Sequence, residues 1–365
     1  MPPTAPHDDV IEWGVMTRPF CTPDWRRSLW QLGSTTVLLV VAELFASLAL
    51  RQSIALTFVL DLVAAGFLVR LFIFQHDCGH GSFFASHRVA DIVGTVLGFV
   101  TLTPYFAWRH AHAVHHATSG NLDRRGIGDI STLTLDEYLA LPTLGRLKYR
   151  LYRNPIVMFG IGATWLFFVL QRFPGVFRQA GRRLGRREQL GVHITTLGAA
   201  AVFAALVLVG GWQSAVLVHG VALAVAASAG VFLFYIQHQH EDAYWRPHAE
   251  WELSRAALQG ASSLRLPALL RFFTGNIGIH HVHHLAPRVA NYNLARLQRE
   301  HQLLRDAPTL GIGAALRTVR LKLYDEAGGR MIGWREVRAV RRARHHKRPF
   351  GDASHGRGAG DSLMV

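Results

Sequence analysis

Cysteine is nearly absent from this chain, which has only Cys21 and Cys78 among its 365 residues. Two cysteines cannot build a disulfide framework, and neither has a second cysteine nearby with which to form a zinc or redox motif. We therefore interpret Cys78 as a small packed residue. The first 27 residues contain charges and prolines but no continuous apolar core, so we expect no secretory signal.

Acidic residues are also scarce. The chain has 24 Asp and Glu against 39 Lys and Arg, which gives a formal net charge of +15. Such a balance first suggests nucleic acid as a partner, but the basic residues flank apolar stretches, as in the run 178–187. This arrangement is typical of the cytoplasmic faces of membrane proteins. We therefore expect membrane lipids and no nucleic acid as partners, with the basic tail 335–348 against anionic headgroups.

Histidine, by contrast, is abundant, with 21 residues. A pair, two triplets and a single residue stand out, nine in all: His76 and His80; His112, His115 and His116; His280, His283 and His284; and His238. Positions i, i+3 and i+4 share one face of a helix, so each triplet can direct all its rings at one point. Because imidazole is a favoured ligand of iron, zinc, copper and nickel, the pattern predicts a metal site.

Half of the chain is hydrophobic, and a spanning helix needs about 20 apolar residues. Apolar stretches lie at about 33–50, 54–74, 89–107, 156–173, 190–209 and 214–236. If the histidines build one site, all must face the same side of the membrane, although 89–107 separates His80 from His112. That stretch must therefore enter and return, or lie in the interface. Three apolar stretches separate His116 from His238, and an odd number of crossings would place His238 on the opposite side. We therefore expect 156–173 to lie in the interface as well.

These constraints predict an all-α integral membrane protein with four transmembrane helices in two hairpins. The first hairpin pairs 33–50 with 54–74, and the second pairs 190–209 with 214–236. Interfacial helices and a cytoplasmic helical cap would hold the metal site. We predict an N-terminal cytoplasmic segment at 1–29, a membrane domain at 30–305, and a basic C-terminal cytoplasmic segment at 306–365 whose end is disordered.

Nine imidazoles are too many for one ion, so we predict two metal ions in one centre. Structural zinc sites are usually rich in cysteine, and calcium and magnesium prefer oxygen ligands. Iron suits a site that binds O₂ and changes its redox state, with copper or manganese as weaker alternatives. A redox centre at the membrane surface would meet acyl chains or other lipids, and we expect an apolar tunnel between the hairpins.

Four segments carry the nine histidines: HDCGHGSF at 76–83, WRHAHAVHHAT at 108–118, FYIQHQ at 234–239, and GIHHVHHLAP at 278–287 followed by NYNL at 291–294. They resemble the histidine boxes of membrane-bound fatty acid desaturases, and most closely those of the bacterial and plastid Δ12/omega-6 type. The likeness runs from about residue 30 to 300. It implies O₂-dependent formation of a cis double bond in a fatty acyl chain, with all nine histidines as catalytic ligands of two iron ions (Fe²⁺/Fe³⁺).

The resemblance also implies an acyl lipid or acyl thioester as substrate. Electrons would come from an external ferredoxin or cytochrome b5 type protein and its reductase, since we find no cytochrome b5 sequence in the chain. One departure is His240, where similar segments usually carry an aromatic residue. Another is Phe234, which replaces the Asn that precedes the lone histidine in the acyl-CoA branch of the family.

Several residues beside the boxes are candidates for orienting ligand rings through hydrogen bonds: Asp77, His110, His240, Asp242, Asn276 and His281. A polar loop after the second box, which includes Asp123 and Asp129, is a candidate contact for a lipid headgroup or an electron donor. We expect a multi-pass protein of the inner or plasma membrane with its active site on the cytoplasmic face.

Two other functions fit parts of the pattern. A lipid or carotenoid hydroxylase or ketolase could use the same scaffold, because a small change in the position of a C–H bond would change the product. A non-enzymatic metal-binding protein or transporter is a weaker alternative, since transporters bind their ions near the bilayer midplane and these histidines lie past the ends of the spans.

Overall fold

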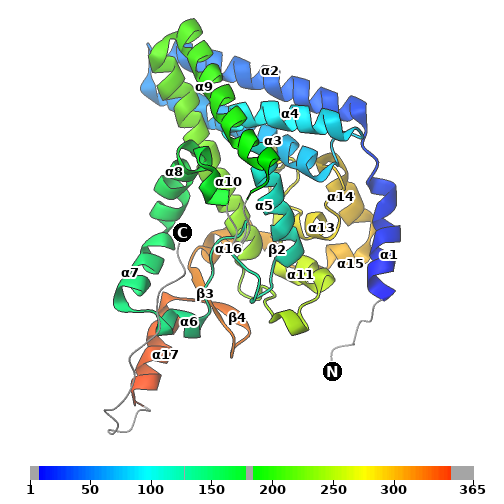
Figure 1. The fold of residues 1–365 in the computed structure, drawn as a ribbon, viewed down its shortest axis with the longest axis vertical. Coiled ribbons are helices and arrows are strands. Elements are labelled where there is room, and N and C mark those ends of the chain that lie inside the picture. Colours follow the sequence, from blue (N-terminus) through cyan, green and yellow to red (C-terminus); the bar gives the residue numbers. More distant parts are fainter. Residues whose placement is uncertain (1–7, 127, 178–183, 347–365) are drawn as a thin grey trace.

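The computed structural model describes residues 8–126, 128–177 and 184–346. Three helical stretches are long and apolar enough to cross a membrane: α2 (Trp25–Ala49), α3 (Ile54–His80) and the run Arg186–His238. That run consists of α9 (Arg186–Ser214), the π-helix η5 (Ala215–Gly220) and α10 (Val221–His238), and Figure 1 shows it rising to one end of the molecule and returning. Gly211 interrupts it with a φ of 83° and a ψ of 162°, a conformation that glycine adopts without steric cost.

Local signals set the ends of the first two long helices. The Asp24 carboxylate caps α2 by accepting from the backbone N–H groups of Arg26 and Arg27. The Ser53 hydroxyl caps α3 in the same way, and such caps satisfy donors that have no partner inside the helix. At its other end α3 stops directly after His80, where Gly81 takes the left-handed conformation with a φ of 65°.

The two stretches expected to stay out of the span bundle each belong to a bent pair of helices. Stretch 89–107 lies in α4 (His87–Thr101) and the start of α5 (Tyr105–Thr118), which meet at an angle of 100°. Stretch 156–173 begins after a bend of 66° between α7 (Thr143–Tyr152) and the helical run Ile156–Arg172. This run contains the π-helix η2 (Ile156–Gly162), α8 (Ala163–Phe168) and η3 (Leu170–Arg172).

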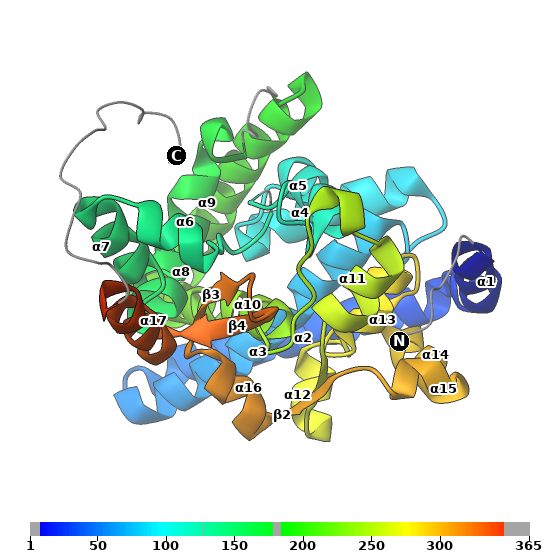
Figure 2. The same cartoon turned by 90° about the horizontal axis from the view of Figure 1, so that it is seen from below.

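Short elements complete the described chain. Before the long helices and between them lie α1 (Asp8–Thr17), η1 (Arg18–Phe20), α6 (Leu135–Ala140) and η4 (Pro174–Phe177). After α10 come η6 (His248–Glu250), α11 (Leu253–Gly260), α12 (Ala268–Phe273), α13 (His280–Leu285), α14 (Asn291–Glu300), α15 (Gln302–Arg305), α16 (Ile312–Thr318) and α17 (Trp334–His346). Seen from below, α11, α13 and the nearby strands lie over the ends of α3 and α10 (Figure 2).

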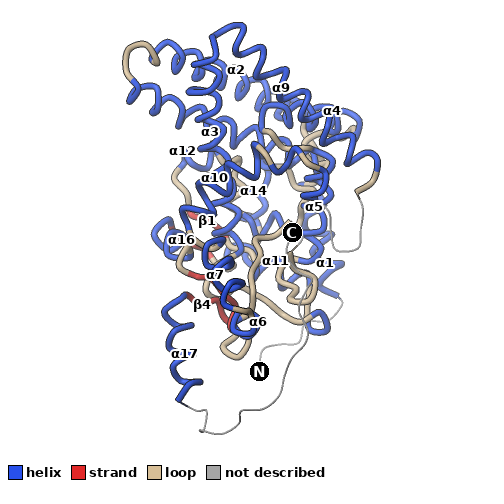
Figure 3. The backbone as a smooth tube through the Cα atoms, turned by 60° about the vertical axis from the view of Figure 1, so that its left-hand side comes forward, coloured by secondary structure: helices blue, strands red, loops and turns tan. Residues whose placement is uncertain are grey.

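The all-α prediction describes most of the chain but omitted two small sheets (Figure 3). β1 (Ser263–Arg265) pairs in parallel with β2 (Thr309–Gly311), and β3 (Leu321–Asp325) pairs antiparallel with β4 (Arg330–Gly333). Strands this short give no usable periodicity in a sequence. The β1–β2 pair and an isolated bridge between Thr134 and Tyr324 also join the region after residue 305 to the body of the protein. The described part of the expected C-terminal segment is therefore folded onto the rest.

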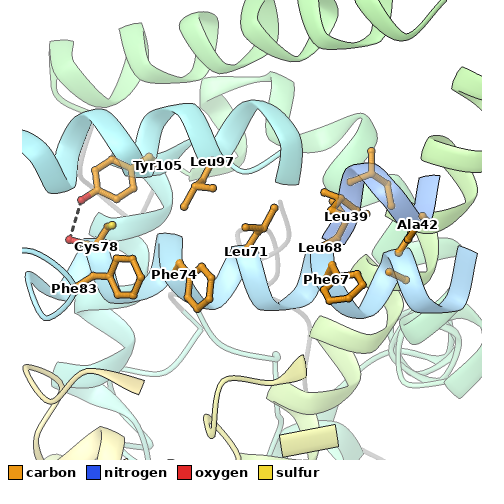
Figure 4. Packing of buried hydrophobic residues seen from close by; sticks show 14 of the residues in the cluster. Leu39, Ala42, Phe67, Leu68, Leu71, Phe74, Cys78, Phe83, Leu97 and Tyr105 are labelled. Carbon is orange, nitrogen blue, oxygen red and sulfur yellow. Dashed lines mark hydrogen bonds between the residues drawn. The ribbon is translucent and has the colours of Figure 1, made fainter. Parts of the chain in front are cut away.

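The largest apolar core lies around α3. Leu68, Leu71 and Phe74 of this helix pack against α2, α4 and α5 (Figure 4). Tyr105 of α5 donates its hydroxyl to the carbonyl of Cys78 at 3.0 Å, and Cys78 itself is buried. A Cβ at Gly94 would lie 2.3 Å from the Tyr105 ring, so glycine permits this close approach. The core therefore holds α4 and α5 firmly against the end of α3.

Polar side chains inside the long helices are paired across elements. Glu43 of α2 contacts the Nδ1 atom of His219 in η5 at 2.7 Å. Arg70 of α3 donates to the Thr35 hydroxyl at 3.2 Å and to the Phe272 carbonyl. Because an unpaired charge is costly within a membrane, the first contact favours packing of α2 against η5, and the contacts of Arg70 favour packing of α3 against α2 and α12. Asp61 of α3, by contrast, is buried, and its Oδ1 atom has no hydrogen-bond partner in the described residues.

Candidate metal centre

The nine histidines come together as two adjoining groups, each able to hold a metal ion. One group contains His76, His80, His112, His116 and His283, and the other contains His115, His238, His280 and His284. Within each group, one ligand nitrogen from every ring lies within 4.8 Å of all the others. Four helices supply the rings, namely α3, α5, α10 and α13. Segments as far apart in sequence as 76 and 284 thus build one centre.

Each histidine triplet is divided between the two groups, contrary to the expectation that all its rings would meet at one point. In α5, His112 and His116 belong to the first group and His115 to the second. The physical reason is the helical pitch: residues at i and i+4 differ by about 40° around the axis, whereas i+3 and i+4 differ by about 100°. A helix that passes between two sites therefore serves both.

Ring nitrogens in the first group lie at metal-ligand spacing. The Nε2 atom of His283 lies 3.0 Å from that of His76 and 3.0 Å from that of His116. The His112 and His116 Nε2 atoms are 3.1 Å apart. Two nitrogens bound at right angles to one ion at about 2.1 Å would be about 3.0 Å apart. These distances therefore fit the edges of a coordination shell.

The second group repeats this spacing. The Nε2 atom of His280 lies 2.9 Å from that of His238 and 3.1 Å from that of His284. His284 and His115 are 3.2 Å apart at the same atoms. The rings of His116 and His284 stack with centroids 4.2 Å apart, so the two groups are in direct contact. The arrangement suits a centre with two ions.

Burial favours the neutral form of imidazoles in both groups. It lowers the pKa of His280, His283 and His284 well below the ordinary value, and neighbouring histidines lower it further. Neutral imidazole is the form that binds a metal. The buried Nε2 atom of His80 has no hydrogen-bond partner among the described residues. A buried polar atom without a partner destabilises the fold, and a bound metal ion would be a partner for this nitrogen.

Two carboxylates contact the histidines from outside. Asp77 approaches the Nδ1 atom of His76 at 3.1 Å, and Asp129 contacts the Nδ1 atom of His115. The sequence predicts a headgroup or donor contact for the loop that contains Asp129, and in the structure its carboxylate contacts the outer nitrogen of the His115 ring. Nothing in its spacing indicated this, because it lies in a loop fourteen residues after His115.

The other candidates for orienting a ligand ring have different partners. His281 donates to the Leu304 carbonyl at 2.8 Å, and burial lowers its pKa to about 4. Asn276 donates to the carbonyl of Asn291 at 3.2 Å. The remaining three candidates are His110, His240 and Asp242. Within the described chain, none of them forms a hydrogen bond with a ring of either group.

An apolar cavity of about 630 Å³ leads to the centre, a volume typical of small-ligand sites. His76, His112 and His280 stand in its wall. The rest of the wall is mainly apolar and comes from α3, α10 and the segment 157–177, including Leu68, Phe72, Met158, Trp165, Phe167, Leu223, Ala227, Gly230 and Phe234. The lining residues of α10 run from Leu223 to Gln237, a length of about 21 Å along the helix, so the cavity can receive a long, thin molecule.

Comparison with known proteins supplies the family. A model described as fatty acid desaturase matches residues 52–311. A fatty acid desaturase of Bacillus subtilis is 42% identical over 321 residues, which are 88% of this chain and 90% of the relative. The sn-1 oleoyl-lipid 12-desaturase of Synechocystis is 26% identical, over 62% of this chain and 63% of its own. An endoplasmic reticulum omega-6 fatty acid desaturase of Glycine max is 28% identical, over 62% of this chain and 61% of its own.

Proposed function

Because this chain belongs to the fatty acid desaturase family, we propose that it is an acyl-lipid desaturase that introduces a cis double bond. It is a membrane protein and an oxidoreductase. The reaction removes one hydrogen from each of two adjacent acyl carbons. O₂, two further electrons and two protons are consumed, and two molecules of water form. The observation that carries the proposal is the pair of histidine groups at the wall of an apolar cavity.

The donor set fits iron. Both groups consist of imidazoles alone, and such ligands suit iron better than calcium or magnesium. The five-histidine group would hold one iron and the four-histidine group the other. When bound, the two ions would supply the oxidising power, drawn from O₂, that breaks unactivated C–H bonds. The electrons would come from an external donor of the ferredoxin or cytochrome b5 type.

The side chains between cavity and centre exclude water. Trp108 lines the cavity and stacks on the His112 ring, with centroids 4.6 Å apart and planes 17° apart. Phe234 also lines the cavity, and the centroid of its ring lies 4.9 Å from that of the His115 ring. An apolar wall of this kind keeps water from reaching the reactive position. It also leaves room for a methylene chain beside His76, His112 and His280.

The cavity would position the substrate. An acyl chain lying in the cavity would be confined laterally by side chains of α3, α10 and the segment 157–177. How far it enters then decides which carbons come to lie beside the histidines, because positional selectivity requires the reacting atoms to be held in place. This arrangement supports a substrate whose apolar tail enters first and whose polar end remains outside.

We further propose two membrane hairpins with the metal centre on the cytoplasmic side. The conformation of Gly211 allows α9 and α10 to form the second hairpin. The contact between Glu43 and His219 supports packing of the two hairpins. The basic run 178–187 before α9 favours a cytoplasmic position for this end of the helix. The protein would then lie in the inner or plasma membrane with four spans.

Lipid analysis tests the function directly. The full chain is expressed in a host that lacks the product, together with a ferredoxin and its reductase, and total fatty acids are analysed by gas chromatography–mass spectrometry. We expect a new fatty acid two mass units below its precursor. Fatty acids sixteen mass units heavier would instead indicate hydroxylation. An unchanged profile from iron-loaded protein would contradict the proposal.

Filling the cavity should change which chains are accepted. A Cβ at Gly230, which lines the cavity, meets no atom within 4 Å, so Gly230→Leu should add bulk without distorting the fold. We expect the ratio of long-chain to short-chain product to fall by about tenfold, since losing one or two well-packed methylenes costs about 1–3 kcal/mol. Gly160→Leu is the matched control, because Gly160 also has open space beyond its Cβ but lies outside the cavity wall. An equal change in both variants would contradict the proposed acyl site.

A further inference from the structure

Each histidine group contains one ring whose second nitrogen meets a carboxylate. In the five-histidine group this ring is His76, held by Asp77, and in the four-histidine group it is His115, held by Asp129. A carboxylate on the Nδ1 atom fixes the ring orientation and leaves Nε2 free as a stronger donor to a metal. The two groups are therefore similar in chemistry, although their carboxylates come from unrelated parts of the chain.

The two carboxylates differ in how they are supported. Asp77 is adjacent to His76, and its Oδ2 atom accepts from the backbone and side-chain amides of Asn291 at 2.8 and 2.9 Å. Asp129 lies in the loop after α5, and its Oδ2 atom is buried without a hydrogen-bond partner in the described chain. Its one polar contact there is the ring of His115.

The loop that carries Asp129 is pressed against α5. Gly128 has a φ of 69°, and a Cβ at this position would lie 2.6 Å from the Ala111 carbonyl oxygen. A larger residue would therefore be strained and would push the loop away from the helix. The tight packing places the Asp129 side chain, which is only 9% exposed, beside the ring of His115.

The charge of Asp129 also needs an explanation. A buried carboxylate is costly unless a positive charge lies nearby. No lysine or arginine forms an ion pair with Asp129 among the residues that the structure describes. Positive charge on the far side of the His115 ring would balance the carboxylate, and a metal ion in the four-histidine group would provide it.

We propose that Asp129 is a positioning residue for the four-histidine group. Its carboxylate holds the His115 ring in the metal-binding orientation and supplies the negative charge that this all-imidazole group lacks. The inference rests on the proposed metal centre, but it concerns the retention of the ion rather than the product. Asp129 does not reach the Nε2 side, where the ion would sit.

Iron retention in purified full-length protein tests this role. Wild type, Asp129→Asn and Asp129→Ala are loaded with iron-57 and dialysed against a series of chelator concentrations. Iron per chain is then measured by mass spectrometry, and the Mössbauer spectrum is recorded. The matched control is Asp123→Ala in the same loop, because the Asp123 carboxylate accepts from the His248 backbone at 2.7 Å and contacts no ring of either group.

We expect both Asp129 variants to lose one of two irons at about 10- to 100-fold lower chelator concentration than wild type. Removing a side chain that hydrogen-bonds to a metal ligand typically lowers metal affinity by this factor. The Asn variant should show the smaller loss, since it can still accept a hydrogen bond from the ring. Asp123→Ala should retain iron like wild type. Equal iron retention and an unchanged spectrum in well-folded Asp129→Ala would overturn the proposal.

This readout separates the role of Asp129 from the proposed function. Wild-type protein that binds two irons but forms no unsaturated lipid would contradict the desaturase proposal and leave the Asp129 comparison valid. Loss of iron from Asp123→Ala to the same extent would mean that the loop only supports the fold. In that case the specific role of Asp129 would be rejected.

Discussion

Replacement of His283 by alanine is expected to reduce the unsaturated product by at least about 100-fold. Replacing a residue that only hydrogen-bonds to a metal ligand already lowers metal affinity or activity by about 10- to 100-fold, and loss of a ligand should have a larger effect. His283 is central to the five-histidine group. Its Nε2 atom lies 3.0 Å from the Nε2 atoms of both His76 and His116. Gas chromatography–mass spectrometry of lipids from cells that express equal amounts of wild type and variant provides the measurement.

The matched control is His193→Ala. His193 is an exposed residue of α9 and belongs to neither histidine group, so this variant should retain product formation. Purified His283→Ala should also bind less iron while eluting as a folded protein in size-exclusion chromatography. Product at the wild-type level in the His283 variant would remove this residue from the proposed ligand set.

Replacement of Arg153 by leucine is expected to have the largest effect on stability. Arg153 is fully buried, and its guanidinium donates to the Gln239 side chain at 2.8 Å and to the Tyr235 hydroxyl at 3.1 Å. It also donates to the carbonyls of Ser131 and Leu321. Leucine would remove the shared donor of these buried acceptors. We expect a loss of about 3–5 kcal/mol, because each buried acceptor left without a donor costs about 1–3 kcal/mol.

The effect should appear as a fall of about 5–10 °C in the midpoint of thermal unfolding in detergent, given the usual relation between free energy and midpoint. Arg150→Leu, in the last turn of α7 and three residues before Arg153, is the control. Arg150 is exposed, and its Nε atom donates to the Tyr138 hydroxyl at 2.8 Å, so its loss should change the midpoint by only a few degrees. Equal midpoints for wild type and Arg153→Leu would show that the buried network contributes little.

Arg153 also explains how the C-terminal region can affect the metal centre. Its partners lie in the loop after Asp129, at the end of α10 beside His238, and in β3. The Arg153→Leu variant should therefore lose iron as well as stability. No sequence pattern indicated this role, because a single arginine among 39 basic residues carries no distinguishing signal.

Much of the centre could be anticipated from the sequence because its histidines are close together along the chain. Helical spacing places His112 beside His116, and His280 beside His284, whatever the rest of the fold does. The family could also be predicted, since the boxes are local motifs. This pattern is the basis of the proposal that the nine side chains bind iron. The two groups in the structure show how the rings are arranged around each proposed ion.

Features that depend on contacts distant in sequence could not be predicted. The pairing of His115 with His284 joins α5 to α13, and that of His238 with His280 joins α10 to α13. Which ring of each triplet joins which group depends on how these helices are rotated about their axes. The sequence constrains that rotation only through packing against neighbours.

The sequence by itself determined the chemistry of this protein: the donor atoms, the apolar stretches and the family. Local spacing and composition encode these properties, because helical periodicity acts over only a few residues. The tertiary structure alone decided that the nine histidines form two groups, and that Asp129 rather than Asp242 reaches a histidine ring. It also decided that the chain from residue 306 to 333 packs against the body. These outcomes depend on close packing between segments that are remote along the chain, and such packing is a property of the whole fold.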